Sequence, residues 1–168
     1  MNVKGKHIVL GVTGGIAVYK AADLASKLTQ AGADVDVIMT DAAAQFVTPL
    51  TFQALTGRPV FTAMFQGLAG GTSPSAMNIT HVALAHRADL IIIAPLTANT
   101  LAKLSYGLAD ELLCATVLAS SCPLLLAPAM ESHMWLNAAT QENIQRMKQR
   151  GAHVVGPGVG RLASGASG

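Results

Sequence analysis

The sequence "HIVLGVTGGI", residues 7–16, is the strongest indication of the fold, because it joins an apolar strand to a glycine turn. Residues 7–13 are mainly apolar and are expected to form a strand. The continuous apolar run at residues 89–94 is typical of a strand buried on both faces. Two adjacent glycines follow, and a helix is expected from about Ile16 to residue 31, with Gly32 as its C-terminal stop. A strand, a glycine turn and a helix in this order indicate the first half of a βαβ unit.

The rest of the chain repeats this alternation of short apolar strands and helical stretches. Strands are expected at residues 35–39, 60–64, 89–94, 124–127 and 153–155, and helices at 49–57, from Thr80 as N-cap to 86, from about 99, from about 109, and at 138–150. Glycine- and serine-rich residues 66–78 read as a loop. The pattern predicts one α/β domain over residues 1–168, with a three-layer, Rossmann-like (flavodoxin-like) fold and a mostly parallel sheet.

The composition favours self-association and argues against several classes of partner. Apolar residues make up 51% of the chain and charged residues 12%, against a usual charged share of about 25%. A net charge of +2 without a Lys/Arg cluster predicts no nucleic-acid partner. No apolar run approaches the ~18 residues of a membrane span, and the N-terminus has no signal-peptide pattern. The spacing of Cys114 and Cys122 matches no metal-binding or redox motif, so we expect no bound metal. We expect both cysteines to be free thiols in a reducing cytoplasm.

Polar and glycine residues follow the first strand, where parallel sheets bind ligands. Gly14, Gly15 and Ile16 open a helix after Thr13, and free backbone N–H groups at a helix start bind anions. The spacing matches neither a G-x-G-x-x-G nor a Walker A motif. A tight turn without a ligand is the alternative reading.

Three later strand ends carry comparable residues. Thr40 ends the second strand, where a hydroxyl suits a phosphate and favours a mononucleotide over NAD, although Asp41 one residue later also fits an adenosine ribose. "PLTANT", residues 95–100, offers hydroxyl and amide groups that either bind a ligand or cap the next helix. "PAMESHMW", residues 128–135, places the carboxylate of Glu131 just beyond a buried strand, where it is catalytic, substrate-facing or only solvated.

The motifs "GVTGGIAVYK", "PLTANT", "GLADELL", "PAMESHMW" and "GRLASG" occur in this order. Together they resemble the homo-oligomeric flavin-containing cysteine decarboxylases, above all the phosphopantothenoylcysteine decarboxylase domain of coenzyme A biosynthesis. The resemblance covers essentially the whole chain. It implies an FMN-binding Rossmann-like fold that assembles as trimers, often as dodecamers of four trimers, with flavin at subunit contacts. The cofactor residues that it implies are Gly14, Gly15, Ile16, Thr40, Thr97, Ala98, Asn99, Thr100 and Ala129.

The implied reaction is the FMN-dependent decarboxylation of 4′-phosphopantothenoylcysteine to 4′-phosphopantetheine. The cysteinyl part is oxidised to a thioaldehyde, carbon dioxide leaves, and the resulting enethiolate is protonated and reduced. His81, in "ITHVALAH", matches the family's active-site histidine, and Met130 lies in the same pocket. The other histidines match nothing comparable and are interpreted as structural.

Two residues depart from the family pattern. Glu131 stands where the family has an asparagine that binds the substrate carboxylate, and two carboxylates repel unless one is protonated or a cation intervenes. Ser164 stands where the family has a proton-donating cysteine, and a hydroxyl is a far weaker acid than a thiol. Residues 158–168 resemble the start of a flexible substrate flap, and we expect the native protein to continue into a phosphopantothenate–cysteine ligase domain.

Three functions fit this pattern. The first is a variant phosphopantothenoylcysteine decarboxylase in which Glu131 acts differently from asparagine. The second is a flavoprotein that decarboxylates another substrate ending in cysteine, such as a peptide. The third is a non-catalytic FMN-binding regulatory protein that acts through its oligomeric surface.

Overall fold

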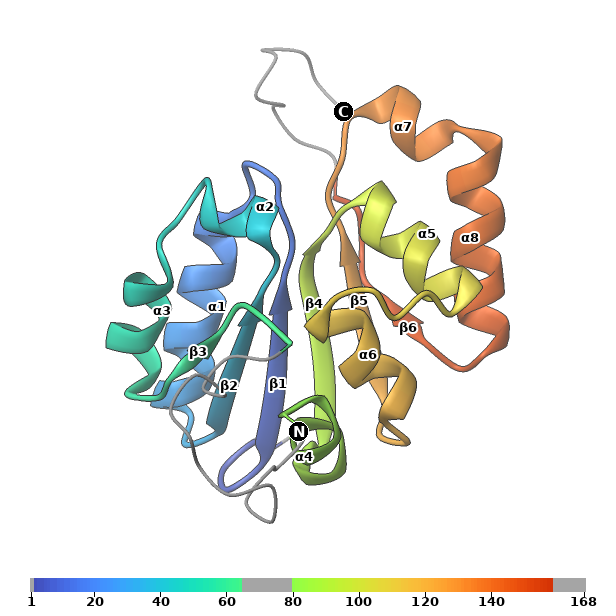
Figure 1. Cartoon of the computed structure of the whole chain (residues 1–168). Helices are drawn as coiled ribbons and strands as arrows, with labels where there is room; N and C mark the ends of the chain where they lie inside the picture. The colour runs from blue at the N-terminus through green and yellow to red at the C-terminus, as the bar shows by residue number, and fades with distance from the viewer. Residues whose placement is uncertain (1, 65–79, 159–168) are drawn as a thin grey trace.

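The computed structural model describes residues 2–64 and 80–158. Within these ranges six parallel strands form one sheet in the order β3-β2-β1-β4-β5-β6 (Figure 1). The strands are β1 (His7–Val12), β2 (Asp34–Met39), β3 (Val60–Phe61), β4 (Leu90–Leu96), β5 (Leu124–Pro128) and β6 (His153–Val154). This is the strand order of the Rossmann fold, which confirms the predicted α/β class.

Helices cover both faces of the sheet and complete the three layers. They are α1 (Val18–Gln30), α2 (Asp41–Ala44), α3 (Pro49–Thr56), α4 (Thr80–Arg87), α5 (Ala98–Tyr106), α6 (Leu112–Ala119), α7 (Ser132–Leu136) and α8 (Ala138–Gln149). Helices α1 and α3 pack on one face, and α4, α5, α6 and α8 pack on the other (Figure 1). No helix in the described ranges has the length and apolarity needed to cross a membrane.

The central strand β1 supplies both halves of the core. Ile8, Leu10 and Val12 point into the core shared with α1 and α3, whereas Val9 points into the core on the other face. Successive side chains of a strand alternate between faces, so a strand covered on both sides must be apolar throughout. Burial on both faces therefore explains why the residues of β1 are almost all apolar.

Helix α1 and strand β3 are shorter than the sequence indicated. The backbone makes a turn at Gly15, and α1 begins at Val18 instead of Ile16. Ile16 is therefore 61% exposed and does not pack on the sheet. Strand β3 pairs with β2 only at Val60 and Phe61, so the expected strand at 60–64 ends early.

Two short helices were missed, because four or five residues carry too little of a 3.6-residue period to be recognised. Helix α2 follows Thr40, whose hydroxyl accepts a hydrogen bond from the N–H of Ala43. Helix α7 follows Glu131, whose carboxylate accepts hydrogen bonds from the first turn. Thr80, expected as an N-cap, is already inside α4.

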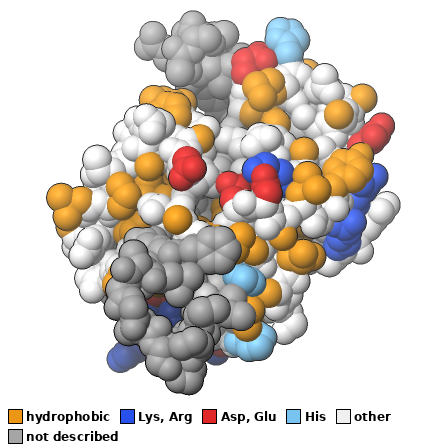
Figure 2. All heavy atoms as spheres, viewed as in Figure 1, with side chains coloured by type: hydrophobic (Ala, Val, Ile, Leu, Met, Phe, Trp, Pro, Cys, Tyr) orange, Lys and Arg blue, Asp and Glu red, His pale blue; other side chains and the backbone are white. Residues whose placement is uncertain are grey.

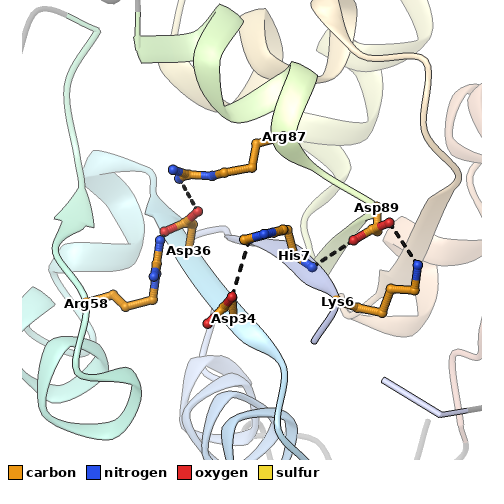
Figure 3. Close-up of polar contacts among 7 residues, drawn as sticks. All are labelled: Lys6, His7, Asp34, Asp36, Arg58, Arg87 and Asp89. Carbon is orange, nitrogen blue, oxygen red and sulfur yellow. Dashed lines mark hydrogen bonds and ion pairs between the residues drawn. The ribbon is translucent and has the colours of Figure 1, made fainter. Parts of the chain in front are cut away.

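A buried carboxylate anchors α4 at the end of the sheet where the strands begin (Figure 3). Asp36, in β2, is 2% exposed. One of its oxygens accepts from Nε of Arg58 at 2.8 Å, and the other pairs with Arg87, the last residue of α4. The hydrogen bond to Asp36 is the main cause of a raised pKa for the Arg58 guanidinium. Breaking the pair would therefore loosen α4 from β2.

We predict that Asp36→Asn lowers the free energy of unfolding by about 2–3 kcal/mol, because two charge-assisted hydrogen bonds lose their acceptor charge. The loss stays below the roughly 3–5 kcal/mol of a fully buried pair, since both arginines are partly exposed. Urea denaturation measures the change in the free energy of unfolding. Asp34→Asn is the matched control: its half-exposed carboxylate lies 3.6 Å from His7 Nδ1, and its loss should cost less than about 1 kcal/mol. Equal losses for the two variants would contradict the anchoring role.

Candidate functional site

The side chain of Thr13 joins the ends of β1 and β4. Its hydroxyl donates to the carbonyl oxygen of Pro95 at 2.6 Å and accepts from the N–H of Thr97 at 3.0 Å. Thr13 is fully buried, so neither hydrogen bond competes with water. The turn after β1 and the segment after β4 are therefore held side by side, at the point where the strand order reverses. Ligands of Rossmann-type sheets bind at this point.

The turn after β1 leaves backbone donors free. The carbonyl oxygen of Gly15 accepts from the N–H of Val18 at 3.0 Å, and α1 begins without a side-chain cap. In the part of the chain that the structure describes, the N–H groups of Gly14, Gly15 and Ile16 have no acceptor. Such donors at a helix start suit an anionic ligand.

The two glycines of this turn are needed for different reasons. A Cβ atom on Gly14 would lie 2.8 Å from the carbonyl carbon of Ala42 and closer still to the Ala42 side chain. A Cβ atom on Gly15 would meet only the Thr97 side chain, at 3.9 Å. Gly14 is thus required for packing against α2, whereas Gly15 leaves space in front of Thr97.

Thr40 lies buried directly after β2, where its side chain caps helix α2. Its Oγ1 accepts from the N–H of Ala43 at 3.2 Å and so caps α2, which leaves the hydroxyl proton for another acceptor. A cavity of about 220 Å³ adjoins it, lined by Thr40 and Asp41 on one side and by Asp110 and Glu111 on another.

The segment after β4 combines the two roles that the sequence left open. Thr97 caps α5, because its Oγ1 accepts from the N–H of Thr100 at 3.3 Å. Thr100 is buried, and Ala98 is half-buried at the first position of the helix. Asn99 is exposed, so its amide is available to a ligand. The same four residues thus stabilise the helix start and present a polar edge.

The end of β5 lies beside the end of β4. The N–H of Ala129 donates to the carbonyl oxygen of Leu96 at 3.0 Å, which continues the pairing beyond the strands. Ala129 and Met130 are half-buried there. The residues named after β1, β4 and β5 therefore lie along one edge of the sheet.

Glu131 is the N-cap of α7. Its Oε2 accepts from the N–H groups of His133 at 2.8 Å and Met134 at 3.3 Å, and its Oε1 lies 3.1 Å from His133 Nδ1. Partial burial opposes the carboxylate charge, but these donors outweigh it and hold the pKa of Glu131 below its usual range. The side chain is therefore ionised at neutral pH, and its charge faces an imidazole ring.

Three acidic or thiol groups gather at the start of α6. Ligand atoms of Asp110, Glu111 and Cys114 all lie within 4.8 Å of one another. The ammonium of Lys103 lies 2.9 Å from Asp110 and 3.5 Å from Glu111, and the hydrogen bond between Lys103 and Asp110 lowers the pKa of that carboxyl. Burial raises the pKa of the Cys114 thiol to about 12. Lys103 already supplies a positive charge beside the two carboxylates, and the buried thiol is protonated at neutral pH, so it is a poor nucleophile.

His81 lies apart from the other candidate residues. It stands in the first turn of α4, which Figure 1 shows at the end of the sheet where the strands begin, opposite α2 and α7. Its Nδ1 is shielded from water and has no hydrogen-bond partner among the described residues. A single chain thus does not bring His81 to the glycine turn. Ser164 lies outside the described residues.

A larger cavity, of about 510 Å³, lies between α5, α6 and α8 at the start of β5. Cys114 and Cys122 line it, together with mainly apolar side chains. It is distant from the carboxyl ends of the strands, so we assign the chemistry to the strand ends in spite of their smaller cavity. Thr13 and His133 were not predicted as contributors to these ends. For Thr13 the sequence carries a signal, a polar residue directly after an apolar run; for His133 it carries none.

The two glycines provide a matched test of the turn. Gly14→Ala should lower the free energy of unfolding by about 1–3 kcal/mol, because the new methyl group meets the backbone of α2. Gly15→Ala, in the same turn, should change it by less than about 0.5 kcal/mol in ligand-free protein, since its Cβ meets no atom closely. Urea denaturation of the two ligand-free variants and of the wild-type protein measures both changes in the free energy of unfolding. Equal stability losses would mean that the glycines are needed for the same backbone reason.

The chain is similar in sequence to proteins of known function. The sequence is 44% identical over 164 residues to the Coenzyme A biosynthesis bifunctional protein CoaBC of Vibrio vulnificus, with 98% of this chain and 39% of the relative covered. The chain thus spans about two fifths of the length of the curated relatives that it matches.

Two solved structures share the fold. The FMN-dependent cysteine decarboxylase SpaF is 32% identical, with a TM-score of 0.80, and covers 92% of this chain and 85% of its own. A PPC decarboxylase variant complexed with pantothenoylaminoethenethiol is 29% identical, with a TM-score of 0.87, and covers 98% of this chain and 89% of its own. The Flavoprotein family matches residues 1–167. By this match over nearly its whole length, the chain belongs to the Flavoprotein family.

Proposed function

We propose that this chain is an FMN-dependent carboxy-lyase that decarboxylates 4′-phosphopantothenoylcysteine in coenzyme A biosynthesis. The observation that carries the proposal is its 44% identity, over 98% of its length, with a bifunctional protein of coenzyme A biosynthesis. The structure with a TM-score of 0.87 supports the decarboxylase part, because it is a PPC decarboxylase bound to pantothenoylaminoethenethiol.

The strand ends suit FMN. Free N–H groups at Gly14, Gly15 and Ile16 are donors for its phosphate, and Gly15 leaves room in front of Thr97. The hydroxyl proton of Thr40 and the exposed amide of Asn99 add hydrogen bonds, with Ala98 and Thr100 at the same helix start. Ala129 would lie against the ring. FMN supplies a two-electron oxidation and re-reduction of the substrate's cysteinyl part.

The residues after β5 face the substrate in this proposal. Ala129 and Met130 are tied to the end of β4, next to the proposed cofactor residues. Glu131 follows and is ionised, so it orders α7 and sets the charge that the substrate's carboxylate meets. Ser164, outside the described residues, stands where a proton donor is expected, and the flap that would carry it begins at residue 158.

His81 acts across a subunit contact in this proposal. Its separation from the glycine turn within one chain leaves the site incomplete, and a second copy would supply the histidine. Exposed apolar side chains support self-association: Tyr19, Phe46, Leu50 and Leu136 are each more than half exposed. Figure 2 shows several exposed hydrophobic side chains scattered over the face in view. We infer a trimer or a dodecamer of four trimers, in the cytoplasm, with a ligase domain as the remainder of a longer protein.

Carbon dioxide release tests the function. The purified, flavin-loaded protein should release it from 4′-phosphopantothenoylcysteine and not from peptides ending in cysteine. Release from peptides alone would favour a peptide decarboxylase. Flavin binding without turnover of either substrate would favour a regulatory protein.

His81→Asn should retain bound flavin and lose decarboxylation by at least about 100-fold, the usual contribution of a positioned acid or base. Absorbance of the flavin and carbon dioxide release measure the two effects. His86→Asn, an exposed histidine of the same helix, is the control and should retain activity. Turnover of the His81 variant at the normal rate would remove this residue from the mechanism.

Asn99→Asp should weaken flavin binding by about 10-fold or more, because an amide donor becomes an anion beside a bound phosphate and flavin. Fluorescence titration of the flavin-free protein measures the affinity. Gln145→Glu makes the same chemical change at an exposed position of α8 and should leave the affinity unaltered. An unchanged flavin content in the Asn99 variant would contradict its assignment.

A further inference from the structure

A substrate carboxylate at the end of β5 needs a positive or donating partner. Glu131 cannot be that partner directly, because it is ionised and has no proton to donate. Its carboxylate already accepts three contacts within its own loop: two backbone N–H groups at 2.8 and 3.3 Å, and His133 Nδ1 at 3.1 Å. The repulsion between two carboxylates therefore has to be relieved by a cation.

A side chain that can form a cation lies directly beside Glu131. The ring of His133 lies against Glu131 through Nδ1, while its side chain is 95% exposed. Its other nitrogen, Nε2, has no partner among the residues that the structure describes. Lys103, a cationic side chain on α5, is already paired with Asp110 and Glu111.

We propose that His133, oriented by Glu131 through Nδ1, binds the carboxylate of the substrate as an imidazolium. In this arrangement Nδ1–H donates to Glu131 Oε1, and Nε2–H donates to the substrate. Glu131 is a positioning residue that acts through the ring. The proposal rests on the proposed function, and it deepens that function by assigning the group that recognises the carboxylate.

The arrangement has a chemical requirement that makes it testable. A neutral imidazole that donates from Nδ1 has only an acceptor at Nε2, which would repel a carboxylate. Both nitrogens must therefore carry a proton when the ligand is bound. The charged group that the structure sets against the ring is Glu131, from the same loop. Binding of a carboxylate ligand should accordingly be accompanied by the uptake of a proton.

Two unreactive ligands isolate the contact. In the first, alanine replaces the cysteine of phosphopantothenoylcysteine, so the carboxylate remains and the thiol is absent. In the second, ethylamine replaces the cysteine, so the carboxylate is absent as well. Calorimetry of the full-length, flavin-loaded protein in two buffers of different ionisation enthalpy gives both affinity and proton uptake.

The wild-type protein should prefer the carboxylate ligand and take up a proton only with it. His133→Gln should weaken binding of that ligand by about 10-fold or more, abolish the proton uptake, and leave the second ligand's affinity within twofold. His133→Arg, which keeps a cation, should retain most of the preference without proton uptake. His153→Gln, an exposed histidine at the far end of the sheet, should behave as wild type.

A double variant tests the role of Glu131. In Glu131→Asn the amide can bind the carboxylate itself and still cap α7, so a further His133→Gln should have no effect. A full effect of His133→Gln in that background would overturn the coupling between the two residues. An unchanged carboxylate preference in the single His133→Gln variant would overturn the proposal.

The outcomes separate this inference from the proposed function. Normal carbon dioxide release by wild type, with no effect of His133→Gln on KM or on ligand preference, refutes the inference alone. Absence of carbon dioxide release, with the carboxylate preference present and lost in His133→Gln, refutes the proposed reaction and supports the recognition group. Failure of wild type to bind either ligand refutes both.

Discussion

The candidate site depends on one buried hydroxyl, that of Thr13, which bonds both to the carbonyl of Pro95 and to the N–H of Thr97. Through it the ends of β1 and β4 keep a fixed spacing at the place where the strand order reverses. The free N–H groups of the glycine turn and the capped start of α5 then face the same space. A methyl group in place of the hydroxyl would leave the N–H of Thr97 without its acceptor, and the carbonyl of Pro95 would keep only the N–H of Thr13, at 3.3 Å.

The two ends of the sheet have different tasks. At the carboxyl ends, side chains cap helices and leave donors free, so this edge suits a ligand. At the opposite end, Asp36 and its two arginines fix α4, the helix that carries His81 (Figure 3). A site that needs both ends cannot be completed by one copy of the chain. The low share of charged residues and the exposed apolar side chains are consistent with such an assembly.

The layers and the parallel sheet could be predicted from the sequence, because β4 and β5 are apolar throughout and short apolar strands alternate with helical stretches along the chain. The contacts between strand ends could not be predicted from the sequence. The hydrogen bond between Thr13 and Thr97 depends on which strands are neighbours, and no local pattern links two residues that are 84 apart in sequence. Glu131 illustrates a second limit. Its carboxylate was recognised as unusual, but its contacts depend on α7, a helix too short for its period to be read.

The close approach of the β1–α1 turn to α2 also constrains how the sequence can diverge. The obstacle to a side chain at position 14 is partly the backbone of Ala42, so no substitution at position 42 removes it. Position 15 faces open space and is constrained only by what binds there. In descendants that lose the ligand, the first glycine should therefore persist while the second drifts. Comparing the two positions among homologues would distinguish ligand-binding lineages from those that retain only the scaffold.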